Sequence, residues 1–226
     1  MSADQTTWEK WFQDLWAYRE DVVYRQLFGD IGSQIHTLPR ELFEKLGLKD
    51  IDPRWLVHGV FECPPTSQRS HWVYITSCLS NPWGVGPDAV DPKKASGLGF
   101  ELMMETPQQV GWGIQVLQWL MAMQILAASG ILQGELLQEY DTVPLQTSIA
   151  PGADSAIRNL LICSPRSYPA EFELPSGKVK LFLCMGITDS EVEFSRTNGA
   201  DALESQLIAN KVFPMTDSNR SAIPFS

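Results

Sequence analysis

The chain has 226 residues, of which 44% are hydrophobic and 19% are charged, and its formal net charge at pH 7 is −10. This apolar content is enough to build a core, so the composition excludes a disordered chain. The pI near 4.7 argues against a protein that tracks nucleic-acid phosphates with a basic face, and it favours a basic partner.

The first half of the chain predicts a helix, several strands and a long loop. Apolar residues from Trp8 to Leu27 recur mostly at three- and four-residue steps behind a capping-box pattern at Thr6 and Glu9. They predict an amphipathic helix that ends near Gly29. The elements expected next are a strand at 33–38, a short helix at 39–47, paired strands at 55–62 and 72–79, a long loop at 81–96 and a strand at 97–105.

The segment at 106–134 is apolar enough that a membrane-spanning helix must be considered. No charged residue occurs between positions 106 and 134, and 112–128 is mostly apolar. However, Gln115, Gln118 and Gln124 interrupt the run, and its flanks carry Glu where membrane helices usually carry Lys or Arg. We therefore interpret the segment as a helix buried inside a soluble protein, with no membrane contact.

The remaining elements complete an α+β pattern. They are strands at 135–140 and 158–163, a hairpin at 172–185, a helix capped by Thr188 and a last helix at 202–208. Strands outnumber helices and lie mostly in adjacent pairs. We expect a single domain over residues 1–226, with a mixed, largely antiparallel sheet and helices packed on it.

Standard signatures of catalysis and cofactor binding are missing. The stretch 84–89 matches a loose GxGxxA pattern, but no strand precedes it, and Pro87 and Pro92 obstruct a following helix. No phosphate-binding loop, nucleophile elbow or zinc-protease motif occurs. The sequence therefore predicts no cofactor.

Cysteine and histidine leave one enzymatic alternative open. His58 and His71 lie on neighbouring predicted strands near Cys63 and Cys78, so a hydrolase or thiol enzyme could use Cys78 with either imidazole. The four cysteines are scattered, lack a Cys-x-x-Cys pair and sit within apolar strands, which favours inert, buried thiols and no metal site. With no export signal at the N-terminus, we expect a cytoplasmic protein.

Charge is distributed unevenly along the chain. Between Lys94 and Arg158 there is no Lys or Arg, whereas six acids occur: Glu101, Glu105, Glu135, Glu139, Asp141 and Asp154. One interpretation is a solvated acidic face. The other is a surface that steers a basic partner toward it, which raises the association rate more than the intrinsic affinity.

Two stretches resemble motifs of the Suppressor of fused family. One is His71-Trp-Val-Tyr-Ile-Thr-Ser-Cys-Leu-Ser80, and the other is Ser96-Gly-Leu-Gly-Phe-Glu-Leu102. Their order and spacing agree with the family, with Leu98 where the family often has Phe. The motif residues that we expect to be architectural are His71, Trp72, Tyr74, Ile75, Gly97, Gly99, Phe100 and Leu102.

This resemblance implies a binding protein. Animal members of the family restrain zinc-finger transcription factors of the Hedgehog pathway by gripping an extended peptide between two lobes, whereas this chain spans about one lobe, so we do not transfer that activity. Small bacterial members look like immunity proteins that neutralise toxins. The acidity of this chain suits a basic toxin domain, so we expect a non-enzymatic domain that sequesters or inhibits a partner protein.

The expected contact surface is the 81–96 loop. Trp83 is an aromatic anchor candidate, Asp88 and Asp91 are charged positioning groups, and Glu101 alternates away from the buried face, where it could bond a neighbouring strand or meet a partner. Strand addition at an exposed sheet edge is a second possible mode. A scaffold that forms homo-oligomers through edge strands is a further alternative, and the sequence does not predict the oligomeric state.

Overall fold

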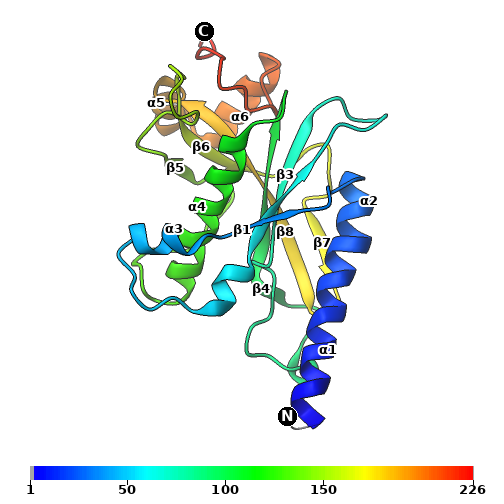
Figure 1. The fold of residues 1–226 in the computed structure, drawn as a ribbon. Helices are drawn as coiled ribbons and strands as arrows, with labels where there is room; N and C mark the ends of the chain where they lie inside the picture. Colours follow the sequence, from blue (N-terminus) through cyan, green and yellow to red (C-terminus); the bar gives the residue numbers. More distant parts are fainter. Residues whose placement is uncertain (1–2, 226) are drawn as a thin grey trace.

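An eight-stranded mixed sheet carries helices on both of its faces (Figure 1). The computed structural model describes residues 3–225, and their side chains from Thr7 onward. The strands are β1 (Ile35–Thr37), β2 (Gly59–Cys63), β3 (Trp72–Ser77), β4 (Ala95–Thr106), β5 (Thr142–Pro144), β6 (Ile157–Cys163), β7 (Glu171–Leu174) and β8 (Gly177–Thr188). The helical segments are α1 (Ala3–Ala17), η1 (Tyr18–Tyr24), α2 (Arg25–Phe28), α3 (Arg40–Lys45), η2 (Pro53–Val57), η3 (Pro87–Ala89), α4 (Gly111–Ala128), α5 (Asp189–Asn198) and α6 (Ala200–Ala209).

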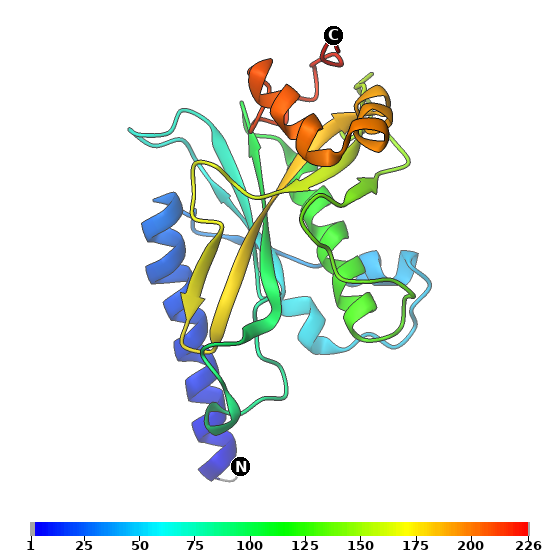
Figure 2. The ribbon, with the colours of Figure 1, turned by 180° about the vertical axis from the view of Figure 1, so that it is seen from behind.

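The strand order is β1-β2-β3-β4-β8-β6-β5, and β7 pairs with β8 beyond this path. All pairings are antiparallel except the central one, in which β4 runs parallel to β8. The predicted α+β class with a largely antiparallel sheet is therefore confirmed. The parallel pair places the two longest strands, β4 and β8, side by side at the middle of the sheet (Figure 2).

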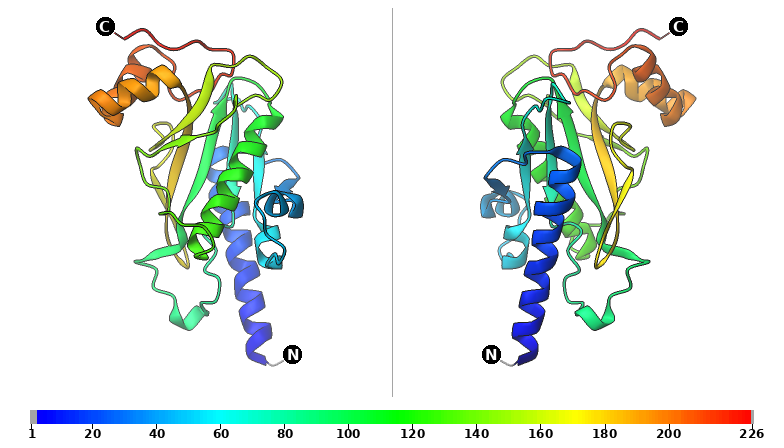
Figure 3. Two further views of the ribbon diagram at one scale, coloured as in Figure 1. Left: turned by 90° about the vertical axis from the view of Figure 1, so that its left-hand side faces the viewer. Right: turned by 90° about the vertical axis from the view of Figure 1, so that its right-hand side faces the viewer.

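Strand alternation along β4 divides the core between the two faces of the sheet. Phe100, Leu102 and Met104 pack on the face covered by α4, whereas Met103 joins the core on the other face. That second core is covered by the N-terminal helix at one end and by α5 and α6 at the other (Figure 3). The sheet is thus buried on both sides, which explains why its central strands read as nearly continuous apolar runs.

The N-terminal helix runs without a break from α1 through η1 to α2. The chain is already helical at Ala3, the first described residue, so Thr6 lies inside the helix and the predicted start at a Thr6 cap is wrong. Its middle seven residues form a π-helix, which turns Arg19 and Tyr24 toward the sheet. The helix ends before Gly29, which has φ +78°, as the sequence predicted.

Two predicted strands are wrong in part or in whole. The strand expected at 55–62 begins only at Gly59, because Pro53–Val57 forms a 3₁₀ turn, in which the Arg54 N–H donates to the capping side chain of Asp52. The segment 135–140 is irregular, and the nearby strand is β5. There the backbone N–H of Leu137 donates to the Gln124 side chain in α4, and Tyr140 has a positive φ of 72°, so the segment does not form a regular strand.

The apolar segment behaves as the sequence predicted. It forms α4, and eight of its residues, including Leu117, Met121 and Gln124, are buried against the sheet and its connections. Within residues 3–225, no helix is long and apolar enough to cross a membrane. Thr188 caps α5 through a full capping box with Glu191, as expected.

Candidate functional site

The two motif stretches meet where β3 ends and β4 begins. Gly97 has φ +58°, and a Cβ built on it would lie 2.5 Å from the carbonyl carbon of Ser80 and 2.6 Å from the carbonyl oxygen of Leu79. Only glycine fits such a close approach of two backbones at a positive φ. The hydrogen bond from the Leu98 N–H to the Leu79 carbonyl oxygen (2.8 Å) then joins the two stretches and fixes the start of the 81–96 loop.

The other motif residues lie on β4 and on or just before β3, and all of them are buried or half-buried. Tyr74, Ile75 and Leu102 are fully buried, and the Tyr74 hydroxyl accepts a hydrogen bond from the Val110 N–H (2.7 Å) just before α4. His71 is half-buried, and its Nε2 lies 2.6 Å from Oε2 of the fully buried Glu105. Further motif positions are buried Phe100, half-buried Trp72, and Gly99 with φ +86°.

Glu101 is buried and does not reach the surface. Its Oε1 accepts hydrogen bonds from the backbone N–H groups of Cys78 and Ser80 and from the Ser80 hydroxyl, and its Oε2 accepts one from Thr76. Burial raises the pKa of this carboxyl above its usual value. Arg19 and these hydrogen bonds lower the pKa and offset part of that rise. Glu101 was expected either to bond a neighbouring strand or to meet a partner, and the structure places it in the first position.

Arg19 is the cation of this buried network, and its side chain is fully buried. Its guanidinium donates to the Asn81 side-chain oxygen (2.6 Å), to the Ser80 hydroxyl (3.3 Å) and to Glu20 (3.3 Å). Burial alone would lower the pKa of Arg19, but its surroundings, including the carboxylate of Glu101, raise it above the usual value. The guanidinium therefore holds the turn at 78–81 against the N-terminal helix as a permanent charge.

Sequence reasoning missed Arg19, although a signal was present. The residue falls on the apolar spacing of the helix, four positions after Leu15 and seven after Phe12. A charged residue on the buried face of an amphipathic helix predicts a paired internal charge.

Trp83 is half-buried and forms a wall of the site. Its ring lies 4.6 Å from the ring of Phe12 and 6.2 Å from that of His58, and the Arg54 guanidinium lies over it at 5.9 Å. The Nε1–H of Trp8 donates to the carbonyl oxygen of Val85 (3.2 Å), so α1 holds the loop beyond Trp83 as well. The ring is therefore partly enclosed by its neighbours, whereas the sequence suggested an exposed aromatic anchor.

Two hollows flank Trp83 and share three lining residues: Asn81, Trp83 and Leu98. The first, called here the α4-side hollow, has about 290 Å³ and is completed by Arg54, Trp55, His58, Leu79, Ile125, Ala128 and Ser129. The second, the loop-side hollow, has about 360 Å³ and lies against the 81–96 loop and Ser176. Asp91 lines the loop-side hollow, and Asp88 is exposed on η3 beside it.

Among the residues that line these two hollows, two buried donors have no acceptor in the described part of the chain, namely Asn81 Nδ2 and Trp83 Nε1. A buried N–H without an acceptor costs roughly 1–3 kcal/mol, so its presence needs an explanation. Both residues line both hollows. At these two residues, a hydrogen-bond acceptor from a ligand would therefore gain the most binding free energy.

The Cys/His alternative finds no support in the geometry. Cys78 is buried, and its sulfur accepts hydrogen bonds from Trp16 and Arg19. Burial raises the pKa of the Cys78 thiol to about 11, which disfavours the reactive thiolate. Among the described residues, no hydrogen bond joins a cysteine sulfur to His58 or His71, and no group of three or more His, Cys, Asp or Glu could hold a metal ion.

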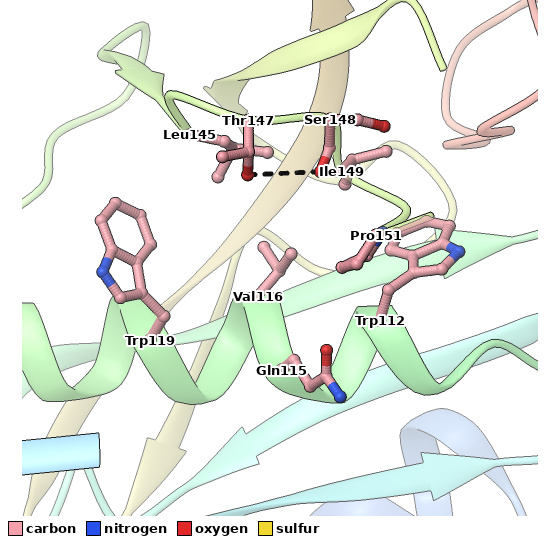
Figure 4. Close-up of a pocket in the computed structure, with 9 residues that line it drawn as sticks. All are labelled: Trp112, Gln115, Val116, Trp119, Leu145, Thr147, Ser148, Ile149 and Pro151. Carbon is pink, nitrogen blue, oxygen red and sulfur yellow. Dashed lines mark hydrogen bonds between the residues drawn. The ribbon is translucent and has the colours of Figure 1, made fainter. Parts of the chain in front are cut away.

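A separate groove of about 230 Å³ runs along α4 (Figure 4). Trp112 and Trp119 stand at its two ends with Val116 between them, and the segment from Leu145 to Pro151 lies across it. None of its lining residues has a buried side-chain donor or acceptor that lacks a partner among the described residues. This groove therefore offers apolar contact, but its described lining residues present no buried polar atom that needs a hydrogen-bond partner.

The fold and the site define an α+β domain with a surface hollowed on both sides of one tryptophan. The Suppressor of fused protein (SUFU) family matches residues 56–221, and the chain belongs to this family. The resemblance found in the two sequence motifs is thereby confirmed.

Solved structures agree with this assignment. A SUFU homologue from Neisseria gonorrhoeae FA 1090 has 19% identity and a TM-score of 0.64, with 95% of this chain and 99% of that chain covered. Sufu in a Sufu–Fu complex has 18% identity and a TM-score of 0.56, with 83% and 92% covered. Drosophila Suppressor of Fused has 20% identity and a TM-score of 0.55. The match covers 73% of this chain and 42% of the Drosophila chain.

No curated protein matches the chain significantly. At the identities of the solved structures, the likeness shows a shared fold. Membership of the family suggests a protein-interaction domain.

Proposed function

We propose that this domain binds a basic partner protein and blocks its working surface, as an immunity protein neutralises a toxin domain. The observation that carries the proposal is the pair of hollows that meet at Trp83, bordered by the exposed 81–96 loop with Asp88 and Asp91. The loop also carries Lys93 and Lys94, so its formal charge is zero, and Lys94 lies 4.0 Å from Asp91. A preformed concave surface offers a fit to a partner protein. The steering of a basic partner comes from the whole chain, whose net charge is −10.

The surface is held in place before any partner arrives. The buried Arg19–Asn81 contact fixes the start of the loop, and the Trp8–Val85 hydrogen bond fixes a later point. Rigid presentation lowers the entropy cost of association, which is what tight stoichiometric inhibition requires. Within this proposal the domain itself makes and breaks no bonds.

The test starts with capture of the partner from the native cell and its identification by mass spectrometry. The purified partner is then titrated against two charge-reversed proteins. Asp88→Lys with Asp91→Lys changes the loop, whereas Glu139→Lys with Asp154→Lys makes the same charge change at exposed positions outside it. We expect the loop variant to lose affinity by about tenfold, chiefly through slower association, and the matched variant to lose less than about threefold.

Toxin neutralisation has its own readout. Expression of the captured partner alone should arrest growth, and co-expression of this domain should restore it, with the loop variant restoring it less well. A partner that is acidic, or one whose affinity falls equally in both variants, would refute the proposal.

A further inference from the structure

The α4-side hollow has the size and lining of a side-chain pocket. At about 290 Å³ it lies at the small end of ligand sites, which suits one side chain better than a cofactor. Its apolar lining comes from Trp55, Leu79, Trp83, Leu98, Ile125 and Ala128. An apolar side chain would therefore be the complementary occupant.

The two donors without an acceptor specify the rest of the ligand. The orientation of the Asn81 amide is fixed, because its oxygen already accepts from Arg19 (2.6 Å) and from Trp16 (3.1 Å). The remaining atom, Nδ2, must be a donor, and Trp83 Nε1 can only donate. Asn81 is 2% exposed, so an arriving ligand group that accepts both N–H bonds gains more than it would at an open surface.

The charges at the hollow favour a neutral acceptor over a carboxylate. Arg54 is held by Asp52 through Nε and Nη2, so its charge is already compensated. Burial lowers the pKa of His58 to about 4, and its imidazole is neutral at pH 7. Arg19, behind Asn81, faces Glu20 and Glu101. Because both nearby arginines are already paired with carboxylates and His58 is neutral, no cation is left to balance a bound anion. A neutral backbone carbonyl therefore fits the donors better than a carboxylate does.

We propose that the α4-side hollow takes one apolar side chain of the partner protein, and that Asn81 Nδ2–H and Trp83 Nε1–H receive a backbone carbonyl oxygen of the same segment. This inference rests on the proposed function, since it names the contact through which the partner is recognised. It assigns to Trp83 a receiving role, as a wall and a hydrogen-bond donor.

The test uses a minimal probe and does not need the partner. The full-length protein, labelled with ¹⁵N, is titrated with N-acetyl-L-leucine N-methylamide, which carries one apolar side chain between two peptide carbonyls. The indole N–H signal that disappears in Trp83→Phe belongs to Trp83. We expect this signal to shift saturably, together with the backbone amides of Leu98 and Ala128, and Trp83→Phe to weaken binding about three- to tenfold as judged from those amides.

Two controls separate the hollow from the surface in general. N-acetylglycine N-methylamide has the same carbonyls without the side chain, and we expect it to bind at least tenfold more weakly. Ala128→Phe fills the rim of the hollow, whereas Gln115→Phe adds the same ring at an exposed position elsewhere on α4. Binding of the leucine probe should be lost in the first variant and kept in the second.

A Trp83 indole signal that stays fixed up to saturating probe, or that shifts equally in Ala128→Phe, would overturn the assignment. That failure is distinct from failure of the proposed function. Full partner affinity in both Trp83→Phe and Ala128→Phe would leave inhibition by this domain standing and place the contact elsewhere. Probe binding without a basic partner in the cell would support the hollow and count against the immunity role.

Discussion

Arg19 and Asn81 lie 62 positions apart in the chain and are joined by a 2.6 Å hydrogen bond from the guanidinium to the amide oxygen. The bond ties the π-helical part of the N-terminal helix to the first residue of the 81–96 loop. It also fixes which atom of Asn81 remains free to donate. One buried cation thus shapes the core on one side and the candidate binding surface on the other.

Removal of that cation should destabilise the whole domain. Arg19→Met keeps most of the side-chain volume but leaves Glu101 buried without its counter-charge, and we expect a loss of about 3–5 kcal/mol in the free energy of unfolding. Urea unfolding followed by tryptophan fluorescence measures the effect. Arg25→Met, which breaks an exposed pair with Asp21, is the control and should change stability by less than about 0.5 kcal/mol. Equal effects would show that Arg19 has no special role.

Gly97 and Gly84 allow backbone strain to be separated from steric conflict. Both have positive φ, but a Cβ at Gly97 would meet backbone atoms of Leu79, Ser80 and Asn81 at 2.5–2.7 Å, whereas a Cβ at Gly84 would meet nothing within 4 Å. Gly84→Ala should therefore cost about 1 kcal/mol for the left-handed backbone alone. Gly97→Ala should cost at least about 2 kcal/mol more in thermal unfolding, and similar melting temperatures would contradict the close approach.

Much of the fold was predictable because its signals are local. The Pro175–Gly177 turn, the Thr188 capping box and the charge-free run of α4 each specify an element through residues that are close in sequence. The wrong strand at 135–140 shows the limit. There the Gln124 side chain, which lies in α4, takes the backbone N–H of Leu137, and a tertiary contact of this kind leaves no periodic pattern.

The candidate site was predictable only as a region. Composition and loop length pointed to 81–96, but the position of Trp83 depends on Phe12 and Arg54, which come from two other parts of the chain. The burial of Glu101 depends on donors from Thr76 and Ser80. Alternation along a strand places a side chain on a face of the sheet, and it does not reveal whether a helix covers that face.

His58 gives the domain a predictable response to acid. Burial lowers its pKa to about 4, so the folded protein keeps this imidazole neutral while the unfolded chain takes up a proton near pH 6.5. The unfolded state binds more protons within this window, and stability should therefore fall as pH drops from 6.5 to 4, by about 3 kcal/mol from this group. Urea midpoints across the range measure the slope, and His58→Gln should flatten it. An NMR titration with a His58 midpoint above pH 6 would contradict the prediction.

Loosening the aromatic contacts of α1 should free the 81–96 loop without unfolding the sheet. Phe12 packs between Trp8 and Trp83, and the Trp8 indole holds the carbonyl of Val85. Trp8→Phe deletes that hydrogen bond while keeping an aromatic ring next to Phe12, and it should cost about 0.5–1.5 kcal/mol. Phe12→Ala removes the packing between the two tryptophans and should cost about 3–5 kcal/mol. Hydrogen exchange should then speed up at 84–94 in both variants, and most in Phe12→Ala.

The amides of β6 and β8 should keep their protection in Trp8→Phe, since that bond lies outside the sheet. Trp119→Phe, at one end of the α4 groove, is the matched control and should leave exchange at 84–94 unchanged. Because a mobile loop must be ordered again on binding, partner affinity should fall in the same order as loop protection. Faster exchange with unaltered affinity would mean that the loop is not part of the contact surface, whatever the charges of Asp88 and Asp91 contribute.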